Sequence, residues 1–157
     1  MRQTITFYNP TTIDDFVEVK KIFIEYQEYL EVDLCFQSFD FELNNLAKIY
    51  KKPKGTIILA KINNEIAGCV ALKPIEENNC EMKRLYVKTE FRNTGLGKKL
   101  VEKIIDYAQK GSYEKMKLDT LIKLETAVKL YKQYGFIETK PYVYNPLEEV
   151  LYFEKTL

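Results

Sequence analysis

The sequence predicts a mixed α/β domain in which a largely antiparallel sheet is flanked by helices. Short β-rich runs and amphipathic segments follow in the order strand, two helices, three strands, helix, strand, helix, two strands. Turn signals join several β-rich runs directly, which favours antiparallel hairpins over a doubly wound parallel sheet. No linker, repeat or low-complexity tract interrupts the 157 residues, so a single domain over residues 1–157 is expected.

The N-terminal half is expected to supply the first four strands and two helices. Thr11, Thr12 or Asp14 can cap the first helix, whose apolar residues recur at helical spacing. Residues 63–65, Asn-Asn-Glu, separate two β-rich runs as a hairpin turn does. The expected segments are a strand at 4–8, a helix with the stripe Phe16, Val19, Phe23, Tyr26 and Leu30, a short helix at 41–50, and strands at 56–62, 66–72 and 80–87.

The C-terminal half is organised around one amphipathic helix that begins at a pair of glycines, Gly95 and Gly97. Its apolar side has the pattern of a helix packed against a sheet and consists of Leu96, Leu100, Val101, Ile104, Ile105 and Ala108. A strand at 116–120, a helix at 124–134 that ends before Gly135, and a hairpin of 136–139 with 150–154 complete the expected order.

Composition excludes several classes of function. Hydrophobic residues make up 46 % of the chain and charged residues 30 %, and the formal net charge is only +1. These values favour a soluble globular protein and argue against a general nucleic-acid binder. No apolar run approaches the ~18 residues of a membrane span and no cleavable leader is visible, so no membrane association and a cytoplasmic location are expected.

Cysteine and histidine usage narrows the available chemistry. The chain has three cysteines, no Cys-x-x-Cys and no histidine. This set offers no plausible zinc site, so no metal is expected, and it suits a reducing compartment. Without histidine, a general base must be a carboxylate, a lysine, a tyrosine, a cysteine or water.

The glycine pair has the features of a phosphate-binding turn. A helix N-terminus exposes unpaired N–H groups and partial positive charge, and glycines there let an anion approach the backbone. The spacing is Arg92-x-x-Gly95-x-Gly97, which is neither a Walker loop nor a three-glycine dinucleotide fingerprint. An ordinary tight turn is the alternative, and Lys98 and Lys99 can neutralise phosphates or simply form a solvated face.

Two motifs together resemble the GNAT superfamily of N-acetyltransferases. Residues 92–97 match its acyl-CoA motif, Arg/Gln-x-x-Gly-x-Gly/Ala, after a strand with a Leu-x-Val ending. Residues 127–136 match its later pattern Ala-x-x-Leu-Tyr-x-x-x-Gly-Phe. The chain departs from the family at Leu124, where asparagine is common, which leaves one polar contact open. The resemblance implies a GNAT-like sheet that is splayed at the acyl-CoA site.

The resemblance also implies acetyl-CoA as co-substrate. The N–H groups of the glycine turn would hold the CoA pyrophosphate, and the backbone of Leu85 and Val87 would pair with pantetheine. The Val87 N–H would also polarise the thioester carbonyl. The full expected set is Leu85, Tyr86, Val87, Arg92, Asn93, Thr94, Gly95, Leu96, Gly97 and Lys98.

Two catalytic residues follow from the same resemblance. Tyr131 matches a tyrosine that in many family members faces the CoA sulfur and protonates the leaving thiolate, with a role as a core aromatic as its alternative. Glu81 matches a glutamate that in several members takes the proton from the substrate ammonium. Its alternative role is a charge pair with Lys83 or another neighbour.

The acceptor pocket is expected between the first two helices, their loop and the last hairpin, with aromatic walls from Tyr26, Tyr29, Phe36, Tyr142 and Tyr144. The predicted function is transfer of an acetyl group from acetyl-CoA to a primary amine of a small molecule or peptide, by direct attack in a ternary complex. The alternative is a non-catalytic acyl-CoA-binding sensor or interaction module. Homodimers are common in the family, but no sequence feature locates an interface.

Overall fold

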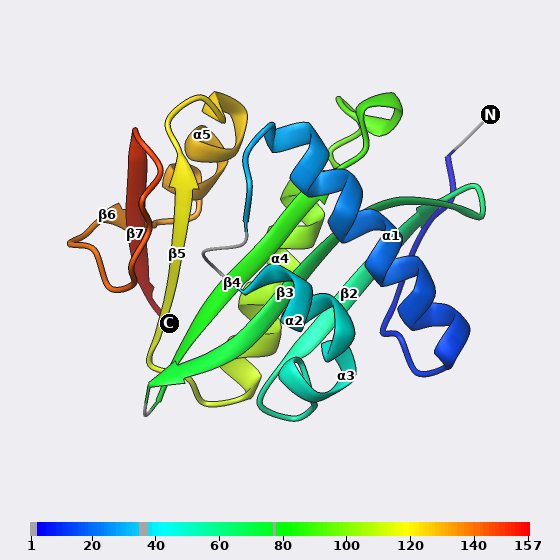
Figure 1. The fold of residues 1–157 in the computed structure, drawn as a ribbon, viewed down its shortest axis with the longest axis horizontal. Coiled ribbons are helices and arrows are strands. Elements are labelled where there is room, and N and C mark those ends of the chain that lie inside the picture. The colour runs from blue at the N-terminus through cyan, green and yellow to red at the C-terminus, as the bar shows by residue number, and fades with distance from the viewer. Residues whose placement is uncertain (1–2, 35–37, 77) are drawn as a thin grey trace.

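The computed structural model describes residues 3–34, 38–76 and 78–157, which form one seven-stranded sheet in the order β1-β2-β3-β4-β5-β7-β6 (Figure 1). Neighbouring strands are antiparallel except β4 and β5, which run parallel. The predicted mixed and mostly antiparallel sheet is therefore confirmed. The strands are β1 (Ile5–Tyr8), β2 (Thr56–Ile62), β3 (Glu65–Glu76), β4 (Asn79–Val87), β5 (Lys115–Leu121), β6 (Ile137–Glu138) and β7 (Val150–Thr156).

Helices cover both faces of the sheet. In Figure 1, α1 and α2 cross one face and α4 lies behind the other. The helices are α1 (Ile13–Leu30), α2 (Phe39–Asn44), α3 (Leu46–Ile49), α4 (Leu96–Lys110) and α5 (Glu125–Gln133), with a 3-10 turn, η2, at Thr89–Phe91. Within the described ranges, none of the helices has both the length and the apolar character needed to cross a membrane.

Each face of the sheet carries its own apolar core. The core on the α4 face contains the whole predicted stripe of that helix, from Leu96 to Ala108, together with Tyr131 of α5. The core on the α1 face is built around Phe23, Phe39 and Leu59. Because both faces of the central strands are covered, a ligand can reach the middle of the sheet only where two strands separate.

The helix predicted at residues 41–50 is instead two short helices, α2 and α3, that meet at Asn45. The Asn45 Nδ2 donates a hydrogen bond of 2.8 Å to the carbonyl of Phe41, the group that would accept the Asn45 N–H in a continuous helix. Asn45 has φ of −137°, outside the helical range. The prediction was wrong because this side chain replaces the backbone donor.

A β-bulge in β4 places two consecutive cations on the same face. Ala71 lies opposite Lys83 and Cys69 lies opposite Tyr86, so one residue of β3 faces both Arg84 and Leu85. Arg84 has a left-handed backbone with φ of 61°. Because of the extra residue, the side chains of Lys83 and Arg84 both reach carboxylates on the α1 side of the sheet.

The sheet is splayed between its two parallel strands, as predicted. β4 and β5 pair only at Asn79–Lys115, Cys80–Met116 and Glu81–Lys117. Beyond Glu81 the two strands diverge, as Figure 1 shows. We call the open space between residues 82–87 of β4 and 118–121 of β5 the β4–β5 gap.

Candidate active site

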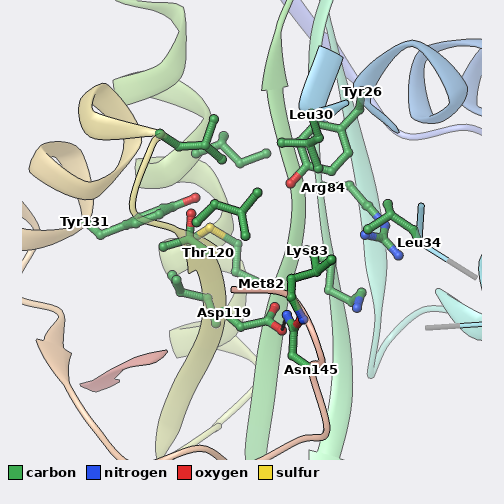
Figure 2. A pocket seen from close by; sticks show the side chains of 15 residues that line it. Tyr26, Leu30, Leu34, Met82, Lys83, Arg84, Asp119, Thr120, Tyr131 and Asn145 are labelled. Atoms are coloured by element: carbon green, nitrogen blue, oxygen red, sulfur yellow. Dashed lines mark hydrogen bonds between the residues drawn. The ribbon is translucent and has the colours of Figure 1, made fainter. Parts of the chain in front are cut away.

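A cavity occupies the β4–β5 gap and has walls from both faces of the sheet (Figure 2). On one side it is lined by members of the α4-face core, namely Met82, Leu85, Leu118 and Tyr131. On the other side it is lined by members of the α1-face core, namely Tyr26, Leu30, Leu34 and Leu121. The cavity therefore spans the plane of the sheet, with lining side chains from both of its faces.

Tyr131 lies on α5 and lines this cavity. Its ring packs edge-on against Phe136 at 5.9 Å and at a tilt against Phe153 at 6.3 Å, centroid to centroid. Figure 2 shows its hydroxyl pointing into the gap. Burial, followed by the nearby groups Tyr26 and Asp119, raises the pKa of Tyr131, so the phenol carries its proton at neutral pH.

Three charged residues line the cavity: Lys83 and Arg84 from β4, and Asp119 from β5. Asn145 Nδ2 donates a hydrogen bond of 3.0 Å to Asp119 Oδ2, and Leu147 N–H donates one of 3.0 Å to Asn145 Oδ1. The second bond fixes the orientation of the amide, so its N–H group faces the carboxylate. The loop between β6 and β7, residues 139–149, which we call the C-terminal loop, thus holds Asp119 in place at the edge of the gap.

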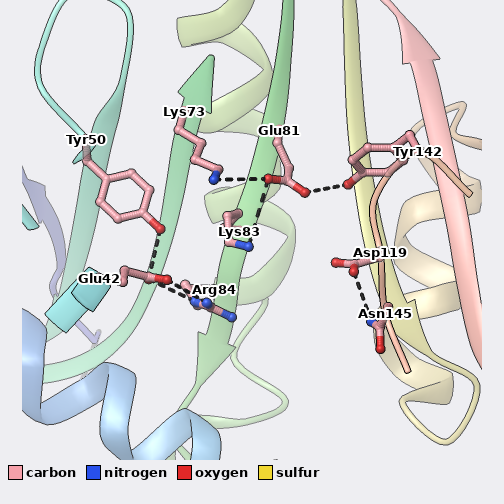
Figure 3. Close-up of polar contacts among 9 residues, drawn as sticks. All are labelled: Glu42, Tyr50, Lys73, Glu81, Lys83, Arg84, Asp119, Tyr142 and Asn145. Atoms are coloured by element: carbon pink, nitrogen blue, oxygen red, sulfur yellow. Dashed lines mark hydrogen bonds and ion pairs between the residues drawn. The ribbon is translucent and has the colours of Figure 1, made fainter. Parts of the chain in front are cut away.

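Arg84 is anchored by a buried ion pair. Its Nε and Nη2 donate to the two carboxylate oxygens of Glu42 at 3.0 and 2.6 Å, and the Tyr50 hydroxyl donates to Glu42 Oε2 at 2.9 Å (Figure 3). Burial alone would raise the pKa of Glu42, but the hydrogen bonds and charge of Arg84 reverse this and hold it below its ordinary value. The pair ties α2 to the bulge of β4.

Glu81 lies outside the cavity lining, at the closed end of the gap. Its carboxylate accepts a hydrogen bond of 2.6 Å from the Tyr142 hydroxyl and lies 3.8 Å from Lys73 Nζ and 3.9 Å from Lys83 Nζ (Figure 3). It is the last residue of β4 that pairs with β5, opposite Lys117. Glu81 is therefore buried among two cations and a phenol.

In the predicted phosphate turn, the backbone N–H groups have no hydrogen-bond acceptor within the described chain. Gly95, the residue before α4, has φ of 81°, and Asn93 has φ of 64°. No hydrogen bond from the N–H groups of residues 93–98 reaches an acceptor in the part of the chain that the structure describes. A Cβ on Gly97 would lie 3.6 Å from the Leu130 side chain and 3.9 Å from that of Val87, which is ordinary contact. The fold by itself does not require glycine at position 97.

Arg92 connects this turn to α1. Its Nε donates to the Val87 carbonyl at 3.2 Å, its Nη1 donates to the Tyr29 hydroxyl at 3.1 Å, and its guanidinium stacks on the Tyr29 ring at 4.3 Å. The Lys88 N–H donates to the Ala67 carbonyl at 2.8 Å. Since N–H directions alternate along an antiparallel strand, the Val87 N–H points away from β3 and toward the gap.

The predicted aromatic walls are only partly brought together. Tyr26 lines the cavity, and burial raises its pKa to about 12. Tyr29 is 42 % exposed and stacks against Tyr86, whose hydroxyl donates to Glu25. Tyr142 contacts Glu81, and Tyr144 is 79 % exposed. Phe36 lies outside the described residues.

Sequence reasoning missed Lys83, Asp119 and Asn145 as cavity residues. Asp119 continues the polar side of β5, which alternates with the buried Met116 and Leu118, so the pattern of the strand gave no signal that this carboxylate faces a cavity. Asn145 lies 26 positions from Asp119, so no local pattern connects them. In the described ranges no cluster of histidine, cysteine or carboxylate side chains has the arrangement of a metal site.

Comparison with known proteins points to one family. The model of the acetyltransferase (GNAT) family matches residues 17–136. A Schizosaccharomyces pombe protein named as an uncharacterised N-acetyltransferase is 44 % identical over 145 residues, which cover 91 % of this chain and 87 % of the relative. The crystal structure of a GNAT acetyltransferase from Staphylococcus aureus Mu50 matches with a TM-score of 0.81, at 23 % identity, over 98 % of this chain and 99 % of that one. A GNAT acetyltransferase from Elizabethkingia anophelis with acetyl-CoA bound matches with a TM-score of 0.65, at 25 % identity, over 98 % of each chain.

Proposed function

Because the chain belongs to the GNAT family of acetyltransferases and is therefore an acyltransferase, we propose that it moves the acetyl group of acetyl-CoA to a primary amine by direct attack in a ternary complex. The observation that carries the proposal is the cavity in the β4–β5 gap, with walls from both faces of the sheet. The thioester approaches from the α4 and α5 side and the amine from the α1 side. Their reacting groups then meet inside the gap.

The residues of the glycine turn fit the pyrophosphate of acetyl-CoA. The N–H groups of residues 93–98 lie at the N-terminus of α4 without acceptors in the described chain, and phosphate oxygens are suited to them. Glycine at position 97 leaves space that the fold does not need, which is expected where a ligand approaches the backbone. Leu85 and Val87 offer backbone groups along the gap, and the Val87 N–H is aimed to stabilise charge on the thioester oxygen.

Tyr131 is the proton donor in this proposal. Its hydroxyl points into the gap from the face that receives the thioester, and burial keeps it protonated. As the amine nitrogen bonds to the acetyl carbon and the C–S bond breaks, Tyr131 supplies a proton to the sulfur. The ammonium substrate loses two protons in all: one restores the Tyr131 hydroxyl and the other is the single proton that the net reaction releases.

Asp119 and Glu81 are the two carboxylates available as proton acceptor, and the geometry favours Asp119. Asp119 lines the cavity on the face that receives the amine, and its Oδ2 is oriented by Asn145. Glu81 lies outside the lining and already accepts a hydrogen bond from Tyr142. A general base must lie within hydrogen-bond reach of the proton that it removes. Glu81 is the alternative base, acting through an intervening water.

A binding and turnover experiment tests the proposal. Acetyl-CoA at 100 times its dissociation constant should stabilise the fold by about 2.7 kcal/mol in a thermal-shift titration, whereas ATP and NAD should have no effect. Release of CoA thiol should then depend on an added primary amine, and Tyr131→Phe should lower kcat by about 10- to 100-fold while acetyl-CoA still binds. Binding without release for any amine would support a sensor instead. No stabilisation by acetyl-CoA would contradict the proposal.

A further inference from the structure

We propose that the acceptor is a zwitterion, a free α-amino acid with an apolar side chain, held by its ammonium group at Asp119 and by its carboxylate at Arg84 and Lys83. This inference rests on the proposed function, because it names the substrate that enters the cavity from the α1 side. The three residues are the charged groups among the side chains that line the cavity, and they lie on opposite sides of the β4–β5 gap.

The β4 wall offers a carboxylate site. The Arg84 side chain is 4 % exposed, and its Nε and Nη2 each donate a hydrogen bond to the Glu42 carboxylate. Nη1 has no hydrogen-bond partner within the described chain, although the residue lines the cavity. A guanidinium that is already held in place by one carboxylate keeps the planar geometry and the free N–H groups that bind a second one.

Lys83 adds a second positive charge next to Arg84. Its side chain is 10 % exposed, and burial together with the charge of Arg84 lowers its pKa. Two cations side by side repel each other in a poorly hydrated site, and a bound carboxylate would offset that repulsion. The bulge that brings both side chains to this face thus places a second cationic donor beside the Arg84 guanidinium at the cavity wall, although Lys83 also pairs with Glu81 and Arg84 with Glu42.

The β5 wall offers an ammonium site. Asn145 Nδ2 donates to Oδ2 of Asp119, and Oδ1 has no hydrogen-bond partner in the described chain, on the face from which the amine would enter. The same carboxylate is the proposed proton acceptor, so binding the ammonium there also places its proton next to the base. The ammonium and carboxylate of one amino acid would therefore meet charges of opposite sign across the gap.

The remaining walls on this side argue against other amines. They are the apolar side chains of Leu30, Leu34, Leu121, Leu124 and Leu147. A polyamine would bring further positive charges to a cavity whose described lining has two cations and one carboxylate, with no second anionic group among those described residues. A simple alkylamine would leave Nη1 of Arg84 without a hydrogen-bond partner in the described chain. An amino acid with a charged side chain would bury that charge among leucines.

A series of acceptors that differ in one group tests the inference. The probes are L-leucine, L-leucinamide, which lacks the carboxylate charge, and 3-methylbutylamine, which lacks the carboxyl group altogether. Isothermal titration into the protein saturated with CoA measures binding without turnover, and thiol release from acetyl-CoA measures kcat/KM. We expect L-leucine to bind and to react at least about 10-fold better than either analogue, as for loss of a charge-assisted hydrogen bond. L-Aspartate and L-lysine should be poorer acceptors than L-leucine.

Lys83→Gln removes one charge without leaving Glu42 unpaired, which an Arg84 substitution would do. The preference for L-leucine over L-leucinamide should fall about 10-fold or more in this variant. Lys110→Gln is the matched control, because Lys110 is a solvent-exposed lysine at the end of α4. The preference of this variant for L-leucine over L-leucinamide should equal that of the parent protein.

Equal binding and turnover of L-leucine and its uncharged analogues would overturn the inference and leave the acetyltransferase proposal intact. Failure of L-leucine to bind the CoA-saturated protein would also overturn it. Failure of acetyl-CoA itself to bind is a separate outcome that would remove the proposed function.

Discussion

Asp119 and Glu81 are two carboxylates in similar settings, of which the proposed mechanism uses Asp119 as the base. Both lie on adjacent strands and both accept a hydrogen bond from the C-terminal loop, Asp119 from Asn145 and Glu81 from Tyr142. Glu81 is enclosed where the strands still pair, whereas Asp119 faces the cavity where they have separated. Access to the substrate, rather than residue type, distinguishes them.

The first prediction compares these two carboxylates. Asp119→Asn should lower kcat about 100-fold and flatten the acidic limb of the kcat–pH profile, because an amide cannot take the proton. Glu81→Gln should change kcat less than Asp119→Asn and leave that limb in place. Steady-state rates across pH measure both. A flattened limb in the Glu81 variant, with an unaffected profile in the Asp119 variant, would reverse the assignment.

At the scale of elements, α4 contributes through its first turn and α2 through one ion pair. The first turn of α4 provides N–H groups and a glycine at position 97 that the protein's own packing does not require. The Glu42 carboxylate on α2 holds Arg84 at the bulge of β4. Gly97 of α4 and Glu42 of α2 can therefore each be substituted to test the contribution of that helix to the site.

Gly97→Ala should separate stability from binding. Alanine loses less backbone entropy on folding than glycine, and its Cβ meets only ordinary contacts at this position in the first turn of α4, so the free energy of unfolding should rise by about 0.4–1 kcal/mol. The same methyl group should obstruct the pyrophosphate and raise the Kd for acetyl-CoA by about 10-fold. Urea unfolding and calorimetric titration measure the two effects. Gly95→Ala is the control, because its φ of 81° makes alanine destabilising there.

Glu42→Gln should destabilise the protein by about 3 kcal/mol at neutral pH, because it leaves Arg84 charged and buried without a counter-ion. The pKa of Glu42 is held below its ordinary value of 4.5 in the folded protein. The ion pair therefore stabilises the fold above that ordinary value, and the contribution is lost as pH falls through the lowered pKa. Urea unfolding across pH should show the difference between parent and variant shrinking in acid. A difference that is constant with pH would contradict this origin.

At the scale of the whole molecule, the two faces of the sheet serve two substrates. In the proposed mechanism the thioester meets the walls on the α4 side and the amine meets the walls on the α1 side, so both would have to be present before transfer. A covalent route through the described cysteines is disfavoured, because burial raises the pKa of Cys69 and raises that of Cys80 to about 12. A buried thiol in its protonated form is a poor nucleophile.

Initial-rate kinetics test this arrangement. Double-reciprocal plots of rate against acetyl-CoA at several amine concentrations should intersect, as they do when both substrates bind before chemistry. Parallel lines would indicate a ping-pong route through an acetylated side chain. Acetylated protein isolated after incubation with acetyl-CoA alone would contradict the ternary complex as well.

Much of the fold was predictable because its signals are local. The six apolar positions of α4 are all buried, since a period of 3.6 residues describes any helix that packs on a sheet. The glycine turn and Tyr131 were predictable because each belongs to a motif with fixed spacing. The break at Asn45 was not, because a side chain competes there with the backbone. The contacts of Asp119 and Arg84 were not, because their partners lie 26 and 42 positions away.

The passage of the cavity through the sheet has a consequence for how such a protein can diversify. In the proposed mechanism, the residues that would meet the amine come from α1, the segment after it and the loop between β6 and β7, whereas those that would meet the thioester come from α4, α5 and the end of β4. Mutations in the first set would then change substrate choice while the second set, and the acyl donor with it, is left untouched. Acceptor specificity would thus be inherited separately from the chemistry, which would make the α1 face the place to redesign.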